Sequence, residues 1–429
     1  MSIDDATRRQ VIGALARGLA LLGPAGLLGA CAGGPGGAIG STSALPSGDA
    51  GAAKPAGEPA APTVKAALLL PLSAGIQMSL VAKGLQQAAE MALFERNMPG
   101  FQLTVHDDKG TPEGAAVAAA GAIAGGAEII LGPLFAASVA AVAPVARKAN
   151  VPVIAFSNDP AAGGHGVHLL SYFSSAETTR AVDYAVRQGR RHFAALIPDD
   201  ALGRDTEPAF RQAVEAGGGR VAVVEHYPAD LSGMMAPSQR VMEAIQGAQD
   251  GGMPIDALFL PSSTDNVGRL AAMIRHHKFD TDKVKLILSS GWDNPTALRD
   301  PKLAGAWMGA PDPGGWREFS ARFGKTYQSS PPRLATLAYD AVTIATAFAT
   351  QPKGERYTEQ NLARTAGFTG IDGMFRLTPK GPIERSLAVL EIQPQGLVAV
   401  DAASGFTAAS PTAPASVPSR VGEASVVRG

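Results

Sequence analysis

Polar side chains that could bind a ligand recur where apolar, strand-like runs end. Six such ends carry Ser, Asn or Asp or lead into a helix: Pro71-Leu72-Ser73, Gly132-Pro133-Leu134, Phe156-Ser157-Asn158-Asp159, Pro198-Asp199-Asp200, Pro261-Ser262-Ser263 and Gly291-Trp292-Asp293. Ligands of open α/β sheets bind outside the carboxyl ends of the strands. Taken singly, each Ser or Asp favours a simple N-cap. Taken together, the six ends predict a cleft that offers hydroxyls, carboxylates and helix N-termini to a small polar ligand.

Motifs for enzyme, metal and nucleic-acid chemistry are missing. Gly324-Lys325-Thr326 does not end a phosphate-binding loop, because Phe319 stands where that motif requires glycine. The sequence contains no Gly-x-Ser-x-Gly nucleophile motif, and no Glu-x-x-His or His-x-x-x-His pair that would ligate a metal. Asp199-Asp200 fits a strand-end turn better than an acid–base pair. A formal net charge of −1 over 429 residues disfavours nucleic-acid binding. We expect no catalysis, no metal and no cofactor.

The elements that position these strand ends alternate between strand and helix, which is typical of parallel βαβ units. The first predicted strands are Val64–Pro71, Phe101–His106, Ala127–Leu131 and Val151–Phe156. A second set comprises His168–Phe173, His192–Pro198, Arg220–His226, Ile255–Pro261 and Val284–Leu288. Helical periodicity fills the intervals between them. The alternation predicts an α/β fold with two doubly wound parallel-sheet lobes joined by a multi-strand hinge.

The segment from Pro295 to Asp401 is too small for a sheet of its own, so we expect it to complete both lobes. It contains two predicted helices and a predicted hairpin of Met374–Leu377 with Leu387–Ile392. The predicted lobe 1 is then 64–172 with 294–373, and lobe 2 is 173–293 with 374–401. The chain is expected to cross between the lobes near Leu170–Ser174, Ser289–Asp293 and Gly373–Arg376.

The two ends of the chain predict export and attachment to a membrane. Residues 1–30 combine a basic start, an Ala/Leu/Gly stretch and small residues, as in a secretory signal peptide. Arg8-Arg9 also fits a twin-arginine signal, and this alternative stays open. Leu28-Gly29-Ala30-Cys31 resembles the bacterial lipobox, which makes Cys31, the only cysteine, the expected lipidation site. Residues 31–63 form a Gly/Pro/Ala-rich tether, and 402–429 a disordered tail.

Several strings resemble the type I periplasmic binding proteins of the branched-chain amino-acid family. They are Leu70-Pro71-Leu72-Ser73, Asp107-Asp108, Leu131-Gly132-Pro133-Leu134 with Ser138, Val151-Pro152-Val153-Ile154, and Ala194–Asp200 with Gly203. The resemblance covers roughly Val64–Asp401 and implies two lobes, a three-strand hinge and a ligand cleft between the lobes. It brings the family's ligand-binding positions to or near Ala136, Ser138, Ser157, Asn158, Leu202, Trp292 and Asp293. The aromatic and acidic features that hold an α-amino acid are therefore weakened in this chain.

A narrower resemblance, to the penicillin-binding protein activators, is carried by the third segment. Its strings are Gly291-Trp292-Asp293, Gly305-Ala306-Trp307, Pro331-Pro332-Arg333-Leu334-Ala335 with Ala338-Tyr339-Asp340-Ala341, and Gly370-Ile371-Asp372-Gly373 with Phe375. These activators are outer-membrane lipoproteins that stimulate a peptidoglycan synthase. Their tandem-helical N-terminal domain has no counterpart in residues 32–62. The resemblance implies a lipid-anchored regulator of peptidoglycan synthesis. The alternative is a solute receptor of an amino-acid ABC transporter.

Partner and location predictions follow from the two resemblances. The expected partners are a penicillin-binding protein, a small polar ligand in the cleft, and a membrane reached only through the lipid. The expected location is the periplasmic side of the envelope, at the outer membrane. Of Trp292, Trp307 and Trp316, at least one should be core. Trp316 lies at a loop-to-helix boundary and is the candidate docking residue, since exposed tryptophan often anchors protein interfaces.

We expect Cys31→Ala to release the protein from membranes, because the thiol that carries the acyl chains is lost. Flotation of membranes from cells expressing either form would measure this. Equal flotation of the variant and the wild type would contradict the anchor assignment.

Overall fold

The computed structural model describes residues 63–406, apart from 229, 231, 278, 294 and 296. The predicted signal peptide, Cys31, the tether up to residue 62 and the tail from residue 407 lie outside the described residues. Within the described part, no helix has the length and apolar character needed to cross a membrane. The same part brings no three metal-binding side chains together.

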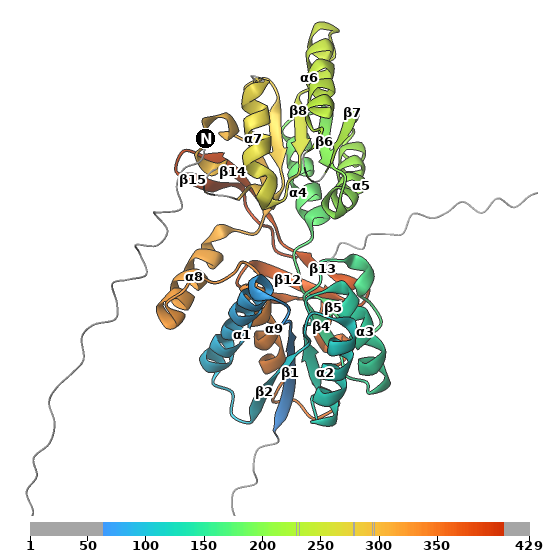
Figure 1. Ribbon diagram of the computed structural model, residues 1–429, viewed down its shortest axis with the longest axis vertical. Coiled ribbons are helices and arrows are strands. Elements are labelled where there is room, and N and C mark those ends of the chain that lie inside the picture. The colour runs from blue at the N-terminus through green and yellow to red at the C-terminus, as the bar shows by residue number, and fades with distance from the viewer. Residues whose placement is uncertain are drawn as a thin grey trace, which may run out of the picture. The chain divides into compact units, whose positions relative to one another are not determined.

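Lobe 1 is built on an eight-stranded sheet in the order β11-β12-β13-β5-β4-β3-β1-β2 (Figure 1). Its strands are β1 (Val64–Leu70), β2 (Phe101–Asp107), β3 (Ile129–Leu131), β4 (Val153–Ala155), β5 (Val167–Leu169), β11 (Phe368–Gly370), β12 (Gly373–Thr378) and β13 (Gly381–Arg385). Its helices are α1 (Ile76–Arg96), α2 (Pro112–Ala124), α3 (Ala136–Lys148), α8 (Pro313–Tyr327), α9 (Ala335–Ala347) and α10 (Glu359–Leu362). Helix α9 packs along α1. The continuous apolar run of β1 is buried because helices cover both faces of the sheet.

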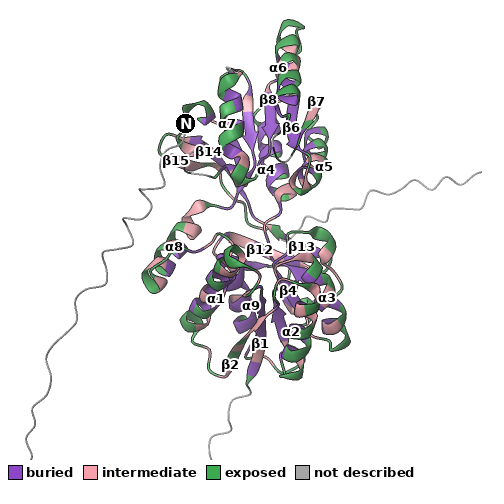
Figure 2. Ribbon diagram, viewed as in Figure 1, coloured by how far each residue is buried: buried purple, intermediate pink, exposed green. Residues whose placement is uncertain are grey.

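Lobe 2 is built on a seven-stranded sheet in the order β15-β14-β10-β9-β8-β6-β7. Its strands are β6 (His192–Pro198), β7 (Arg220–Tyr227), β8 (Ala257–Leu260), β9 (Lys285–Leu288), β10 (Trp307–Ala310), β14 (Ala388–Gln393) and β15 (Gly396–Asp401). Its helices are α4 (Ser174–Arg187), α5 (Ala201–Ala216), α6 (Met235–Asp250) and α7 (Val267–His276). Figure 2 shows that the central strands of both sheets are largely buried, while the helices expose one face.

The predicted fold class is confirmed: two α/β lobes are wound around mainly parallel sheets. Each sheet also carries antiparallel strands at one edge, β11 with β12 and β13 in lobe 1, and β14 with β15 in lobe 2. The sheets are therefore mixed rather than wholly parallel.

Two of the three predicted crossings are wrong. The chain does cross at residues 170–173, between β5 and α4, as expected. It then crosses at Pro311-Asp312, between β10 and α8, and not near Ser289–Asp293. The last crossing is Ser386-Leu387, between β13 and β14, and not near Gly373–Arg376. Residues 297–310 therefore belong to lobe 2, and residues 374–385 to lobe 1.

Strand pairing explains both corrections. Strand β10 has only four residues, yet it pairs in parallel with β9, through Trp307 and Ile287, and so stays in lobe 2. The predicted hairpin partner was wrong because β12 turns back at Pro379-Lys380 and pairs with β13. Strand β14 instead lies antiparallel to β10 and places Ala388 opposite Ala310.

Helix α9 buries a carboxylate beneath the β11–β12 turn. Oδ1 of Asp340 accepts a hydrogen bond of 3.0 Å from the backbone N–H of Ile371, whereas Oδ2 is buried without a partner among the described residues. A Cβ on Gly370 would lie 2.3 Å from that oxygen, so only glycine fits there. Burial raises the pKa of Asp340 to about 7, although the positive charge of Arg385 opposes the shift.

We expect Asp340→Asn to stabilise the fold above neutral pH. The folded protein holds a proton on Asp340 that the unfolded chain releases near pH 4, so the wild type loses free energy of unfolding as the pH rises from about 4 to about 7. The asparagine side chain does not titrate, so the variant does not lose free energy of unfolding over this pH range. Because one pKa unit corresponds to about 1.4 kcal/mol, the variant should gain roughly 2–4 kcal/mol over the wild type at alkaline pH.

Denaturant unfolding of both proteins on the acid and the alkaline side of this range measures the difference. Glu318→Gln, which removes a carboxylate from the exposed face of α8, is the matched control. A difference between Asp340→Asn and wild type that does not change with pH would contradict the raised pKa.

Candidate functional site

Parallel pairing gathers the strand ends of each lobe at one edge of its sheet. In lobe 1, Leu70 at the end of β1 pairs with Asp107 at the end of β2, and Leu68 pairs with Leu131 at the end of β3. All three chain crossings also leave and enter at these carboxyl edges, through connectors of four, two and two residues. The loops at the two carboxyl edges are therefore close along the chain to the connections between the lobes.

The candidate ligand residues differ widely in exposure at these edges. Five of them expose their side chains: Ser73, Asn158, Asp199, Ser263 and Asp293. Leu134, Ala136 and Asp200 are half-buried. Ser138, Ser157, Ser262 and Trp292 are buried. The structure thus leaves about half of the candidates available to a ligand.

The buried candidates hold the loops in place. Oγ of Ser157 accepts a 3.1 Å hydrogen bond from the N–H of Asp159, and Ser262 donates to the carbonyl of Ser263 at 2.8 Å. Trp292 is 0% exposed, and its indole N–H donates to the carbonyl of Leu260 at 2.9 Å. As a ligand contact, Trp292 is therefore a wrong prediction, because its ring is part of the lobe 2 core. Ser138 is likewise enclosed within lobe 1.

Two acidic candidates differ in their roles: Asp200 caps a helix, and Asp293 has a pKa that burial raises. Oδ1 of Asp200 accepts from the N–H of Gly203 at 3.1 Å and so caps α5, as the simpler interpretation predicts. Burial raises the pKa of Asp293, against the opposing charge of Arg333. Asp293 remains exposed at the end of the turn that follows β9.

The structure also assembles a cluster that the sequence did not reveal, around Arg333 at the corner between α8 and α9. Its Nη1 and Nη2 donate to Oδ2 and Oδ1 of Asp372, at 2.9 and 2.6 Å. Nη1 also donates to the hydroxyl of Tyr172 at 2.6 Å. The guanidinium carbon lies 4.7 Å from the ring centres of both Tyr172 and Trp316. Segments distant in sequence thus meet at one cation.

Hydrogen bonding keeps both members of this ion pair charged. Burial works against a charged Asp372, but hydrogen bonds and the charge of Arg333 hold the pKa of this carboxyl below its usual value. Burial alone would lower the pKa of Arg333, whereas Tyr172 and Asp372 raise it above the usual value. Asp372 is only 1% exposed, while 40% of the Arg333 side chain is open to solvent. The cluster therefore presents a permanent positive charge at the surface of lobe 1.

A second, more buried group of charges lies beside this cluster. Arg385 packs against the rings of Tyr172 and Phe375, at 5.1 and 5.3 Å, and its Nε and Nη2 are buried without partners in the described part of the chain. Glu177, in the first turn of α4, is buried, and its Oε2 has no hydrogen-bond partner among the described residues. Burial raises the pKa of Glu177 to about 7, although Ser290 and the positive charge of Arg333 oppose the shift.

Trp316 is the most exposed of the three tryptophans, as predicted. Trp292 and Trp307 are buried, whereas Trp316 is half-buried in the first turn of α8. One face packs toward Phe319, at 5.8 Å between ring centres. Its contact with Arg333 associates it with the charged cluster.

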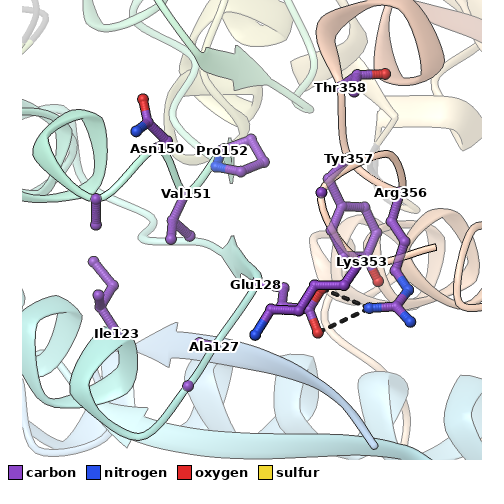
Figure 3. A pocket seen from close by; sticks show the side chains of 13 residues that line it. Ile123, Ala127, Glu128, Asn150, Val151, Pro152, Lys353, Arg356, Tyr357 and Thr358 are labelled. Atoms are coloured by element: carbon purple, nitrogen blue, oxygen red, sulfur yellow. Dashed lines mark hydrogen bonds and ion pairs between the residues drawn. The ribbon is translucent and has the colours of Figure 1, made fainter. Parts of the chain in front are cut away.

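One hollow of lobe 1 lies at the other end of its strands. A pocket of about 500 Å³ opens at the amino ends of β3 and β4, beside the ends of α2 and α3 (Figure 3). In Figure 3, Arg356 points at Glu128, and their ion pair of 2.7 Å joins the 353–358 segment to the sheet. Arg356 is only 4% exposed in its side chain, so its charge serves the fold. This pocket is at the opposite end of the strands from the edge where ligands of such sheets bind.

Comparisons with known proteins agree with this architecture. A putative branched-chain amino acid ABC transporter protein from Rhodospirillum rubrum matches with a TM-score of 0.68 and 18% identity, over 79% of this chain and 100% of that one. A substrate-binding protein from Desulfitobacterium hafniense in complex with Leu matches at 0.58 and 18%, over 79% and 100%. A solute-binding protein from R. palustris in complex with benzoate matches at 0.57 and 16%, over 80% and 97%.

Sequence identities of 16–18% establish only that these proteins share the fold. Comparison with curated proteins found no match. The family model described as periplasmic binding protein matches residues 63–396, which include all the strands of both lobes except β15, of which only Gly396 is matched. That family consists of binding proteins, and membership implies a periplasmic location. The chain therefore belongs to the periplasmic binding protein family.

Proposed function

We propose that this protein is the solute-binding component of an ABC importer and holds a small polar solute at the carboxyl edges of its two lobes. Amino acids are the first solutes to consider. The observation that carries the proposal is the placement of exposed polar side chains at these edges in both lobes, Ser73 and Asn158 in lobe 1 and Asp199, Ser263 and Asp293 in lobe 2. Fold alone would not support a ligand, because one fold serves many functions.

Two further observations support this proposal, and the predicted lipid anchor is compatible with it. The solved relatives include a complex with leucine and a complex with benzoate. The short crossings at the same edges connect the lobes where a solute would touch both of them. A lipid on Cys31 would keep the receptor beside its membrane.

We expect titration calorimetry against a panel of amino acids and aromatic acids to find at least one ligand with micromolar affinity, about −8 kcal/mol. Enclosing the solute between the lobes buries apolar surface, so the heat-capacity change on binding should be negative. Titrations at several temperatures measure both quantities.

A pair of variants tests where the solute binds. Asn158→Ala removes an exposed amide from the carboxyl edge of β4 and should weaken binding about tenfold, the value of one good hydrogen bond. Lys353→Ala changes the pocket at the opposite end of the strands and should leave affinity unchanged. Weakening by Lys353→Ala alone would move the site to that pocket and contradict the proposal.

We retain regulation of peptidoglycan synthesis as a second candidate function. The specific observation in its favour is that two strings of the activator resemblance, Pro331–Ala335 and Gly370–Gly373, supply Arg333 and Asp372 of one surface cluster beside Trp316. In that case a penicillin-binding protein, at the outer membrane, would be the partner.

For this second candidate, Trp316→Ala should cost about 2 kcal/mol or more of synthase binding with little loss of fold stability. Crosslinking in the native envelope, followed by quantification of captured penicillin-binding proteins, measures the effect. Unchanged capture per folded molecule, with a lowered melting temperature, would make Trp316 an ordinary packing residue.

A further inference from the structure

Arg333 is held in a fixed orientation although its side chain is 40% open to solvent. The carboxylate of Asp372 accepts hydrogen bonds from both terminal nitrogens of Arg333, and the hydroxyl of Tyr172 accepts one from the second hydrogen of Nη1. The rings of Tyr172 and Trp316 lie against the planar guanidinium. Tyr172 is itself fixed by a 2.6 Å hydrogen bond between its hydroxyl and that of Thr336. An exposed arginine normally loses rotamer entropy when it binds a ligand, and here that cost is already met within lobe 1.

The bonds made by Arg333 leave one side of the guanidinium free. A guanidinium has five N–H groups in a rigid plane. Three of them point at Asp372 and Tyr172. The remaining two, on Nε and Nη2, have no partner among the described residues and lie on the same side of the plane. Two parallel N–H groups of this kind match the two oxygens of a carboxylate.

The surrounding charges favour a ligand group with a single negative charge. Arg333 and Arg385 carry two positive charges, and Asp372 carries one negative charge. Asp340 and Glu177 are buried carboxyls whose raised pKa values leave them partly protonated near neutral pH. With both protonated, Arg333, Arg385 and Asp372 together carry one positive charge, and the nearby carboxyl of Asp293 reduces this excess further. Such a site suits a carboxylate better than a dianionic phosphate.

We propose that the free Nε–Nη2 edge of Arg333 binds the carboxylate of the solute, so that lobe 1 captures the acid group at the corner between α8 and α9. This inference rests on the proposed solute-binding function and names the chemical class of its ligand. It assigns the acid group to a residue far along the sequence from the strand-end serines and Asn158. Arg333, Asp372 and Trp316 belong to lobe 1, and Tyr172 to the connector that leaves it, so the bonds that orient Arg333 need no contact from lobe 2.

The test compares carboxylates with their amides on the full mature protein. L-Leucine and benzoate are the acid probes. Leucinamide and benzamide, in which a neutral carboxamide replaces the carboxylate, are the matched controls. We expect an acid probe to bind and its amide to bind at least about tenfold more weakly, the value of one charge-assisted hydrogen bond. The Nε–H resonance of Arg333, assigned by its loss in Arg333→Lys, should shift on addition of the acid and not of the amide.

Variants complete the experiment. Arg333→Lys keeps the charge beside Asp372 but loses the two-pronged edge, and should weaken acid binding at least about tenfold. If that variant does not fold, Arg333→Gln with Asp372→Asn replaces the ion pair by neutral amides and gives the same expectation. Arg322→Lys is the control, because Arg322, in α8, also lies over an aromatic ring, that of Tyr339, and pairs with Glu95 outside the cluster.

The outcomes separate the two proposals. A panel solute that binds wild type and Arg333→Lys equally, without moving the Nε–H resonance, overturns the role of Arg333 and leaves solute binding intact. Equal affinity for acids and amides also overturns it. Failure of every panel solute to bind the wild type overturns the proposed function, and this inference with it.

Discussion

A buried carboxylate, Asp372, sets the constraint on which the lobe 1 surface depends. A carboxylate with 1% exposure must be paired and fully hydrogen-bonded, because burying an unpaired charge costs several kcal/mol. Arg333 and Tyr172 provide those bonds. In doing so they join the connector after β5, the α8–α9 corner and the β11–β12 turn at one point. The orientation of Arg333, and therefore its free edge, follows from the need to neutralise Asp372.

The same region contains the chain connections between the lobes. Tyr172 belongs to the connector that leads into α4, and Arg385 is the last residue of β13, directly before the crossing into β14. Arg180 of α4 donates to the carbonyl of Leu387, within that crossing. Residues that fix the connectors therefore border the residues proposed to hold a solute. A ligand bound there acts on side chains that also determine how the connectors are held.

The fold by itself does not choose between a solute receptor and a protein regulator. Relatives at 16–18% identity share the two-lobed architecture, and the side chains at the strand ends must decide the chemistry. Here several of these side chains are buried or cap their own loops, as Ser157 and Asp200 do. The exposed polar groups and the cation at Arg333 favour a small ligand with an acid group. The half-buried Trp316 beside Arg333 is the feature that the two functions would share.

Local pattern determined the class of fold and the position of most elements. The apolar run of β1 and the repeated alternation of strand and helix require helix-covered parallel sheets, and parallel pairing then brings the ends of successive strands to one edge. Tertiary structure alone decided the rest. Strand β10 has only four residues, so its local sequence does not indicate which sheet it joins. Its pairing with β9 assigns it to lobe 2. Trp292 stands just after a strand, as the other candidate residues do, but its ring packs into the core of lobe 2. The Arg333 cluster combines positions 172, 316, 333 and 372, whose spacing carries no periodic signal. Their meeting is a consequence of how the chain returns to lobe 1, because long-range packing, rather than local propensity, brings those four side chains together.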